Sequence, residues 1–225
     1  MRSERSTAIF IGILLIAAIG FGILNSIPAL ERPDYLTELA AITPRVLIAV
    51  FFQAAMACVY LCIAALFYPV IKKYNEALAA GYFGFRIIGA AFLFVGIVSL
   101  LLLLTLSQSF VSAVNPDLLY FQTTGELLRI GRDLMNHIGM ILPWSLGGLI
   151  LYYSIYKIKL VPGWLSVWGI ASSALTVIST FMLMLGVINI VTPIYFLLNM
   201  PTALFELTLA IFLIIRGFNP VTVDL

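Results

Sequence analysis

The stretch GFRIIGAAFLFVGIVSLLLLLTL, residues 84–106, holds one charged residue, Arg86, and it decides the class of this protein. An apolar run of about 18 residues or more is long enough to cross the hydrocarbon core of a bilayer as an α-helix. Further runs of this kind fill most of the chain, so the sequence predicts a single all-α domain over residues 1–225. It is a polytopic transmembrane bundle of six helices. The predicted spans are approximately 7–24, 44–70, 84–106, 134–156, 164–187 and 193–216.

The overall composition agrees with this prediction. Hydrophobic residues make up 63% of the chain, charged residues only 10%, and the mean hydropathy is +1.13. A water-soluble domain needs far more polar surface than this. The formal net charge of +2 is too small to indicate nucleic acid as a partner. Membrane lipid is therefore the partner that the composition predicts, whereas it indicates no oligomeric state.

The distribution of lysine and arginine predicts the orientation of the chain. Connections on the cytoplasmic side of a membrane are enriched in these residues. With six crossings, one side receives Arg2, Arg5, Lys72, Lys73, Arg86, Lys157, Lys159 and Arg216. The other side receives Arg32, Arg45, Arg129 and Arg132, interleaved with acidic residues. We therefore expect both termini to be cytoplasmic.

Glu206 lies near the middle of the predicted helix 193–216. An acidic group at this depth costs about 2.5–3.5 kcal/mol on insertion scales unless it is paired or protonated. Arg86 is its best candidate partner, because helical rise places the two at depths that two flexible side chains can bridge. Glu206 is either part of a structural ion pair or hydrogen-bond network, or a carboxylate that binds a proton or a ligand. Arg86 is alternatively a cation that extends to the inner interface.

A second group of polar residues leads into the predicted helix 134–156. Spacings of three and four residues align much of this stripe on one helix face. The stripe contains Glu126, Arg129, Arg132, Asp133, Asn136 and His137. Counting depth along the helices places other polar groups at the level of its inner end, namely Gln53, Ser179, Thr180 and Asn199. Two interpretations stay open: a polar cavity in the outer half of the bundle, with Pro143 and Trp144 at its floor, and ordinary hydrogen bonding between helices.

The sequence contains no recognisable catalytic or metal-binding arrangement. Its single histidine, His137, cannot supply a bis-histidine haem or a histidine-rich zinc site. Ser145 lacks the preceding glycine of a nucleophile elbow, and no glycine-rich phosphate loop occurs. We therefore expect no catalytic residue, no metal and no cofactor, and an enzyme is the least favoured class.

Three segments resemble the bacterial membrane proteins grouped as domain of unknown function 4386. They are Glu76–Ala90, then Tyr152-Tyr153 followed by Leu160–Gly169, and Pro201–Leu207 followed by Arg216–Phe218. Members of that family often carry an acidic residue after the arginine of the third helix, where this chain has Gly89. The resemblance covers most of the chain and implies a multi-pass helical bundle of the bacterial inner membrane. It implies no activity.

Two function hypotheses follow from these residues. In the first, the protein binds or transports a small molecule or lipid in the outer half of the bundle. Its candidate ligand-binding or proton-coupling residues are Glu206, Arg86, His137, Asn136, Gln53, Asn199, Asp133 and Arg132. In the second, the protein is a structural or regulatory membrane subunit, and its polar residues only fix helix packing.

Overall fold

A computed structural model describes residues 2–190 and 192–220, and within this part the prediction of an all-α bundle is confirmed. Residues 1, 191 and 221–225 of the predicted domain, and the side chain of Arg2, lie outside the described part. The helices long and apolar enough to span a membrane are Glu4–Leu24, Thr43–Lys72, Glu76–Ser112, Leu118–Lys157, Gly163–Met184 and Pro193–Ile215. These six segments correspond one to one to the six predicted spans.

The elements follow one another along the chain as helices joined by short connections. In order they are α1 (Arg2–Leu24), a 3-10 turn η1 (Pro28–Glu31), α2 (Tyr35–Ala41), α3 (Thr43–Lys72), α4 (Glu76–Ser112), α5 (Leu118–Leu134), a π-helical segment η2 (Met135–Met140), α6 (Ile141–Lys157), α7 (Gly163–Met184) and α8 (Pro193–Ile215).

Local sequence explains where several of these helices begin. The side chain of Asn75 accepts a hydrogen bond from the backbone N–H of Leu78 at the start of α4. Asp117 does the same for Tyr120 at the start of α5, and Thr192 for Tyr195 at the start of α8. Such caps satisfy backbone donors that the first helical turn leaves unpaired.

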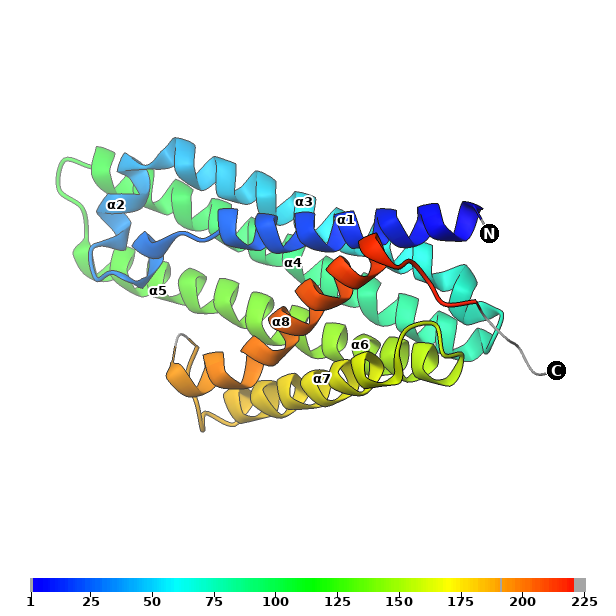
Figure 1. Ribbon diagram of the computed structural model, residues 1–225. Coiled ribbons are helices and arrows are strands. Elements are labelled where there is room, and N and C mark those ends of the chain that lie inside the picture. Colours follow the sequence, from blue (N-terminus) through cyan, green and yellow to red (C-terminus); the bar gives the residue numbers. More distant parts are fainter. Residues whose placement is uncertain (1, 191, 221–225) are drawn as a thin grey trace.

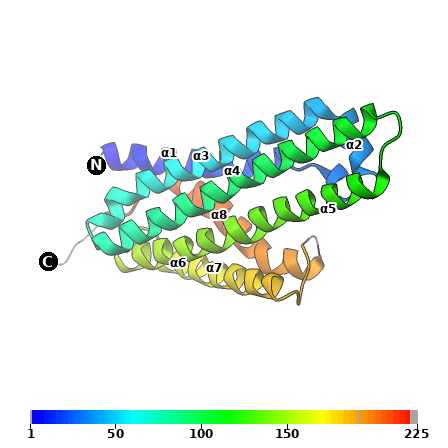
Figure 2. The ribbon, with the colours of Figure 1, turned by 180° about the vertical axis from the view of Figure 1, so that it is seen from behind.

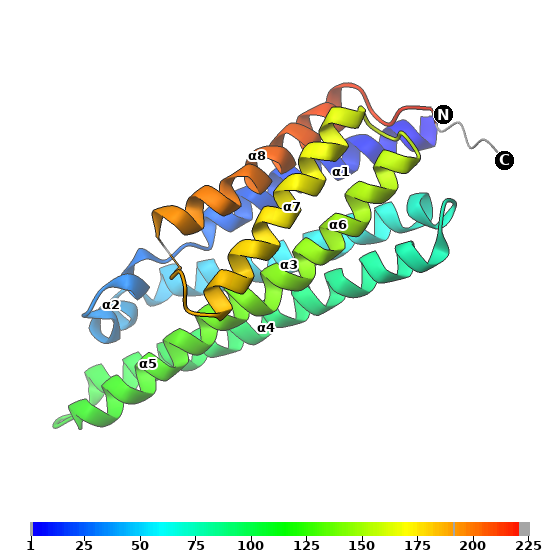
Figure 3. The same ribbon diagram turned by 90° about the horizontal axis from the view of Figure 1, so that it is seen from below.

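The long helices form a closed ring in the order α1, α3, α4, α6, α7, α8, with α8 packed against α1. Figure 3 shows α7 between α6 and α8. Both described chain ends lie at one end of this bundle, which we call the terminus end (Figure 1). The opposite end, where α2 and α5 lie, is the distal end. An even number of crossings is therefore confirmed, whereas the cytoplasmic location of the terminus end stays a prediction.

Helix α4 is much longer than a membrane span requires. Its 37 residues rise about 55 Å, against a hydrocarbon core of about 30 Å. At the distal end, α4 and α5 extend beyond α7 and α8 (Figure 2). There α2 packs on α4 and builds a second apolar core, which includes Leu30, Leu36, Leu39, Leu100 and Leu103.

The boundaries of two predicted spans were too narrow. The predicted helix 84–106 runs from Glu76 to Ser112, and the predicted helix 134–156 begins at Leu118. Apolar composition marks only the part of a helix inside hydrocarbon, and it gives no signal for helical turns that continue into the polar region. In α5 those turns carry charges of both signs that compensate one another at spacings of three and four.

Candidate functional site

A cavity of about 320 Å³ lies within the helix ring, and we call it the central cavity. All six long segments contribute to its wall. Representative lining residues are Ile23 from α1, Tyr60 from α3, Arg86 from α4, Tyr152 from α6, Thr176 from α7 and Glu206 from α8. The volume is at the lower end of the range of about 300–1,000 Å³ that is usual for small-molecule sites.

Arg86 is the least satisfied polar residue of this wall. Its side chain is 5% exposed, and its Nε and Nη1 atoms are buried without a hydrogen-bond partner. Its guanidinium carbon lies 5.7, 5.4 and 5.1 Å from the ring centroids of Tyr60, Tyr82 and Trp144. Cation–π contacts of this length are attractive, yet they satisfy no N–H donor. The wall of an internal cavity thus contains a buried cation with two N–H-bearing atoms that no other group of the described residues satisfies.

Glu206 of α8 lines the same cavity. It is 6% exposed, and its Oε2 accepts a hydrogen bond of 3.3 Å from the hydroxyl of Tyr60. Pro201 stands in α8 one to two turns before it. Because proline removes a backbone donor, it weakens the helix at the point where α8 meets the cavity.

The two charged groups line one cavity without forming an ion pair. No contact of 4.0 Å or less joins Arg86 to an acidic group among the described residues. The prediction that the two residues lie at a similar depth agrees with their common cavity, whereas the predicted direct pairing is not found. The sequence did not show that Tyr60 takes the position of direct partner to Glu206.

Asn199 is the third predicted site residue that lines the central cavity. Its Nδ2 donates hydrogen bonds of 2.9 Å to Ser179 and 2.8 Å to the carbonyl of Tyr195. One turn further along α8, the hydroxyls of Thr202 and Thr176 lie 2.8 Å apart. The contacts Asn199–Ser179 and Thr202–Thr176 join α8 to α7 and form a polar strip on the cavity wall.

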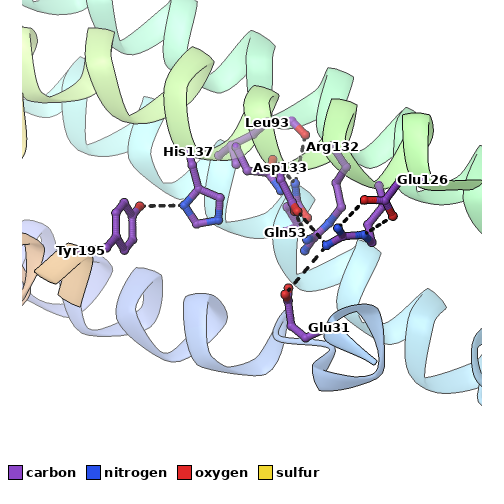
Figure 4. Close-up of polar contacts among 10 residues, drawn as sticks. Glu31, Gln53, Leu93, Glu126, Arg132, Asp133, His137 and Tyr195 are labelled. Atoms are coloured by element: carbon purple, nitrogen blue, oxygen red, sulfur yellow. Dashed lines mark hydrogen bonds and ion pairs between the residues drawn. The ribbon is translucent and has the colours of Figure 1, made fainter. Parts of the chain in front are cut away.

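Gln53 and Asn136 lie in a different contact, between α3, α4 and η2. The Nε2 of Gln53 donates to Oδ1 of Asn136 at 3.0 Å and to the carbonyl of Leu93 at 3.2 Å (Figure 4). Gly96 makes room for this bond, because a Cβ at that position would collide with the Asn136 amide. Neither Gln53 nor Asn136 lines the central cavity. Their geometry is that of an interhelical hydrogen bond.

His137 also lies outside the wall of the central cavity. Its Nδ1 is 2.7 Å from the hydroxyl of Tyr195, so that η2 and the first turn of α8 are joined (Figure 4). Asn136 and His137 are consecutive residues of the π-helical segment η2. The side chain of Asn136 points toward α3, and that of His137 points toward α8. Segments of π-helix are often found at functional sites.

Asp133 and Arg132 belong to a charge cluster near the distal end. Arg132 Nη1 lies 2.8 Å from Oδ1 of Asp133, and Arg129 Nη2 lies 2.7 Å from Oε1 of Glu126. Arg129 also approaches Glu31 at 3.9 Å, which links α5 to η1 (Figure 4). The opposite charges in this cluster compensate one another. The cluster joins α5 to η1 and is not part of the central cavity.

The same region contains a buried tyrosine outside the spanning helices. Tyr35 of α2 packs against Gly125 of α5, where a Cβ would collide with its hydroxyl. Burial raises the pKa of Tyr35 above its usual value, and the charge of Glu126 adds to this effect.

Tyr60 and Tyr152 were not among the predicted site residues. Both are buried and line the cavity. The sequence does place their hydroxyl groups in the middle or inner part of apolar helices, which is one indication of a polar site. However, an aromatic ring at such a position is equally typical of core packing. Within the described residues, no group of three or more histidine, cysteine, aspartate or glutamate side chains is placed to hold a metal ion.

Comparison with known proteins places the chain among membrane proteins of unassigned activity. A family model described as domain of unknown function (DUF4386) matches residues 8–217. No curated protein and no solved structure matches the chain.

Proposed function

Since the chain belongs to the DUF4386 family, a family without an assigned activity, we propose its function from the central cavity. The protein is a multi-pass membrane protein that binds a small molecule with an acidic group, and Arg86 pairs with that group. Glu206 adjusts the charge of the site. We place the protein in the bacterial inner membrane, as the family resemblance implies.

The unpaired donors of Arg86 carry this proposal. Burying a cation whose N–H donors are not satisfied is costly in a folded protein, and more so at membrane depth. A carboxylate in the cavity would accept two parallel N–H bonds from the guanidinium, which are strong and specific for a planar anion. The neighbouring cavity of about 320 Å³ supplies the space for such a ligand.

Glu206 supports a second element of the proposal, the coupling of binding to a proton. With Glu206 ionised, its charge and that of Arg86 sum to zero at the cavity wall. With Glu206 protonated, the wall carries one net positive charge and attracts an anion more strongly. Proton uptake by Glu206 would therefore favour ligand binding, and a proton-coupled transporter uses coupling of this kind.

A specific observation favours a second candidate, a structural membrane subunit without a ligand. The bonds Gln53–Asn136 and His137–Tyr195 use predicted site residues to join helices. Bonds of this type fix helix packing in membranes. This alternative accounts for these residues, but it leaves the free donors of Arg86 and the cavity beside them unexplained.

Fluorescence of Trp144 provides the test, because this residue lines the cavity. In a Trp164→Phe, Trp168→Phe background it is the only tryptophan of the chain. The protein is reconstituted in lipid nanodiscs and titrated with 4-iodobenzoate, whose iodine quenches a nearby tryptophan. The uncharged 4-iodobenzamide is the matched control ligand.

We expect saturable quenching by 4-iodobenzoate and a dissociation constant about tenfold or more higher in Arg86→Gln, since a charge-assisted bond is lost. Arg86→Lys should recover part of the affinity, because it keeps the charge but not the planar fork. Helix content and elution volume control for folding. Equal binding to Arg86→Gln and the unaltered protein contradicts the proposal, and absence of saturable quenching favours the structural subunit.

A further inference from the structure

We propose that the central cavity receives its ligand from the bilayer, through an opening between the distal halves of α1 and α8. The ligand class is a membrane-dissolved carboxylic acid with a hydrocarbon tail. This inference rests on the proposed function, and it names the substrate class and the route for the same site.

Toward the terminus end, α1 and α8 are closely packed. Gly12 lies so near α8 that a Cβ there would be 2.7 Å from the carbonyl oxygen of Ala210 and 2.7 Å from a side-chain carbon of Ile214. Ile11 beside it is fully buried. No route into the cavity passes through this part of the interface.

Toward the distal end the two helices separate, as Figure 1 shows. Along α1 the lining residues change from buried Ala18, 1% exposed, to Ile23, 70% exposed. Along α8 they change from buried Glu206 to exposed Ala203. Because the lining residues become exposed along both facing helices, the cavity opens between α1 and α8.

The rest of the wall is closed by comparison. The lining residues Arg86 of α4, Ser145 of α6 and Ser173 of α7 are all buried. On the distal side, the contact between His137 and Tyr195 joins η2 to α8 one turn beyond Asn199. The opening between α1 and α8 is therefore the exposed side of the cavity.

The surroundings of this opening are apolar. Ile16 of α1 and Met200 and Leu204 of α8 are exposed large hydrophobic residues within membrane-spanning helices. A helix surface of this composition faces hydrocarbon. A molecule dissolved in the bilayer reaches such an opening by lateral diffusion, whereas a strictly water-soluble molecule would have to leave water first.

The two ends of this path define the ligand. The outer end contacts hydrocarbon, and the inner end is lined by Arg86, a buried cation with two donors that have no partner among the described residues. An amphiphile with an acidic head and an apolar tail matches both. A volume of about 320 Å³, at the lower end of the usual range of about 300–1,000 Å³, suits one head group with part of one tail rather than a two-chain phospholipid.

The test blocks the opening without altering Arg86. Gly22 and Ala203 line the cavity from α1 and α8. A Cβ at Gly22 would lie 3.6 Å from the sulfur of Met56, so Gly22→Phe fills the path from the α1 side, and Ala203→Phe places a ring on the α8 side. Gly20→Phe and Leu204→Phe are matched controls on the same helices, since neither residue lines the cavity and a Cβ at Gly20 would have nothing within 4 Å. The probe is 2-bromohexadecanoate, whose bromine lies next to the carboxylate and therefore quenches Trp144 when the head group reaches Arg86. Binding is measured in the background variant Trp164→Phe, Trp168→Phe reconstituted in vesicles.

We expect association about tenfold or more slower in both blocking variants and unchanged in both controls, because opening the path then requires a conformational change. Unchanged rates in the blocking variants, with weakened binding in Arg86→Gln, would overturn the lateral route and leave the proposed function standing. Undiminished binding in Arg86→Gln would instead overturn the proposed function. Equal saturable quenching by a brominated phosphatidylglycerol would overturn the assignment to a single-chain acid.

Discussion

Tyr60 on α3 donates a hydrogen bond of 3.3 Å to Glu206 on α8, although these two helices are not neighbours in the ring. The bond therefore joins two parts of the cavity wall that α1 separates in the ring. It occupies one carboxylate oxygen, Oε2, and no acidic group of the described residues lies within 4.0 Å of the Arg86 guanidinium. Tyr60, rather than Arg86, is thus the direct partner of the Glu206 carboxyl.

Removing the Tyr60 hydroxyl should destabilise the protein. In Tyr60→Phe the buried carboxyl of Glu206 loses its donor, and an unsatisfied buried acceptor costs about 1–3 kcal/mol. The free energy of unfolding in mixed micelles measures the effect. Tyr153→Phe is the control, because Tyr153 is 43% exposed on α6. Equal stability of both variants would show that the bond to Glu206 contributes nothing.

Two glycines of α1 should respond differently to alanine. Gly12→Ala places a methyl group against the Ala210 carbonyl, so that α1 and α8 must move apart, at a cost of about 1–3 kcal/mol. Gly20→Ala meets nothing within 4 Å and should be neutral or stabilising by up to about 1 kcal/mol. Thermal unfolding of the two variants in one detergent is the measurement. A stable Gly12→Ala variant would contradict the close helix contact.

The Gln53–Asn136 bond should appear as coupling between two substitutions. Gln53→Leu and Asn136→Leu each leave a partner amide unsatisfied, whereas the double variant removes both groups. Interhelical bonds in membranes have coupling energies of about 0.6 kcal/mol on average and up to about 1.7 kcal/mol. A double-mutant cycle on unfolding free energies measures this quantity. Strictly additive effects would mean that the bond does not stabilise the fold.

Binding of 4-iodobenzoate should strengthen as the pH falls through the titration of Glu206. The charged and titratable groups that share its surroundings are Arg86, Tyr60, Tyr82 and Tyr152. Arginine and tyrosine ordinarily titrate above pH 9, so below that pH a change in the charge of the wall comes from Glu206.

Glu206→Gln should therefore bind the anion with little dependence on pH over this range. Trp144 quenching at several pH values measures the profile, with the uncharged 4-iodobenzamide as control. An identical pH profile in Glu206→Gln and the unaltered protein would reject coupling through this residue.

The orientation of the bundle should place both termini in the cytoplasm. Lys72, Lys73, Lys157, Lys159 and Arg216 all lie at the terminus end, and positive charge is retained on the cytoplasmic side. Reporter domains fused to each terminus, one active only in the cytoplasm and one only outside it, measure this. Reports from opposite compartments would contradict the even number of crossings.

Much of the fold was predictable because hydrocarbon imposes a simple requirement. Each run such as 84–106 must form a helix that satisfies its own backbone hydrogen bonds, and short connections then force neighbouring helices to alternate in direction. The limits of α4 and α5 were not predictable in this way. Outside hydrocarbon, capping and charge pairing set the helix ends, as Asn75 and Asp117 do here.

The candidate site was predictable only in part. Arg86 and Glu206 were identified because charge at membrane depth is costly, and Asn199 because it lies at a similar level. Gln53, Asn136 and His137 share that depth, yet they point into helix contacts rather than into the central cavity. Tyr60 and Tyr152 were not predicted, because the sequence does not indicate which residues a buried aromatic side chain contacts.

By itself, the sequence determined the solvent of this protein, the number of its spans and the depth of each polar residue, because hydropathy and helical rise are properties of the chain alone. Only the tertiary structure decided which of those residues face one another. Facing depends on the rotation and tilt of each helix about its axis, and these are set by contacts such as that of Gly12 with α8 and that of Gly96 with Asn136. For this reason Arg86 and Glu206 share a cavity, whereas Gln53 and His137 join helices.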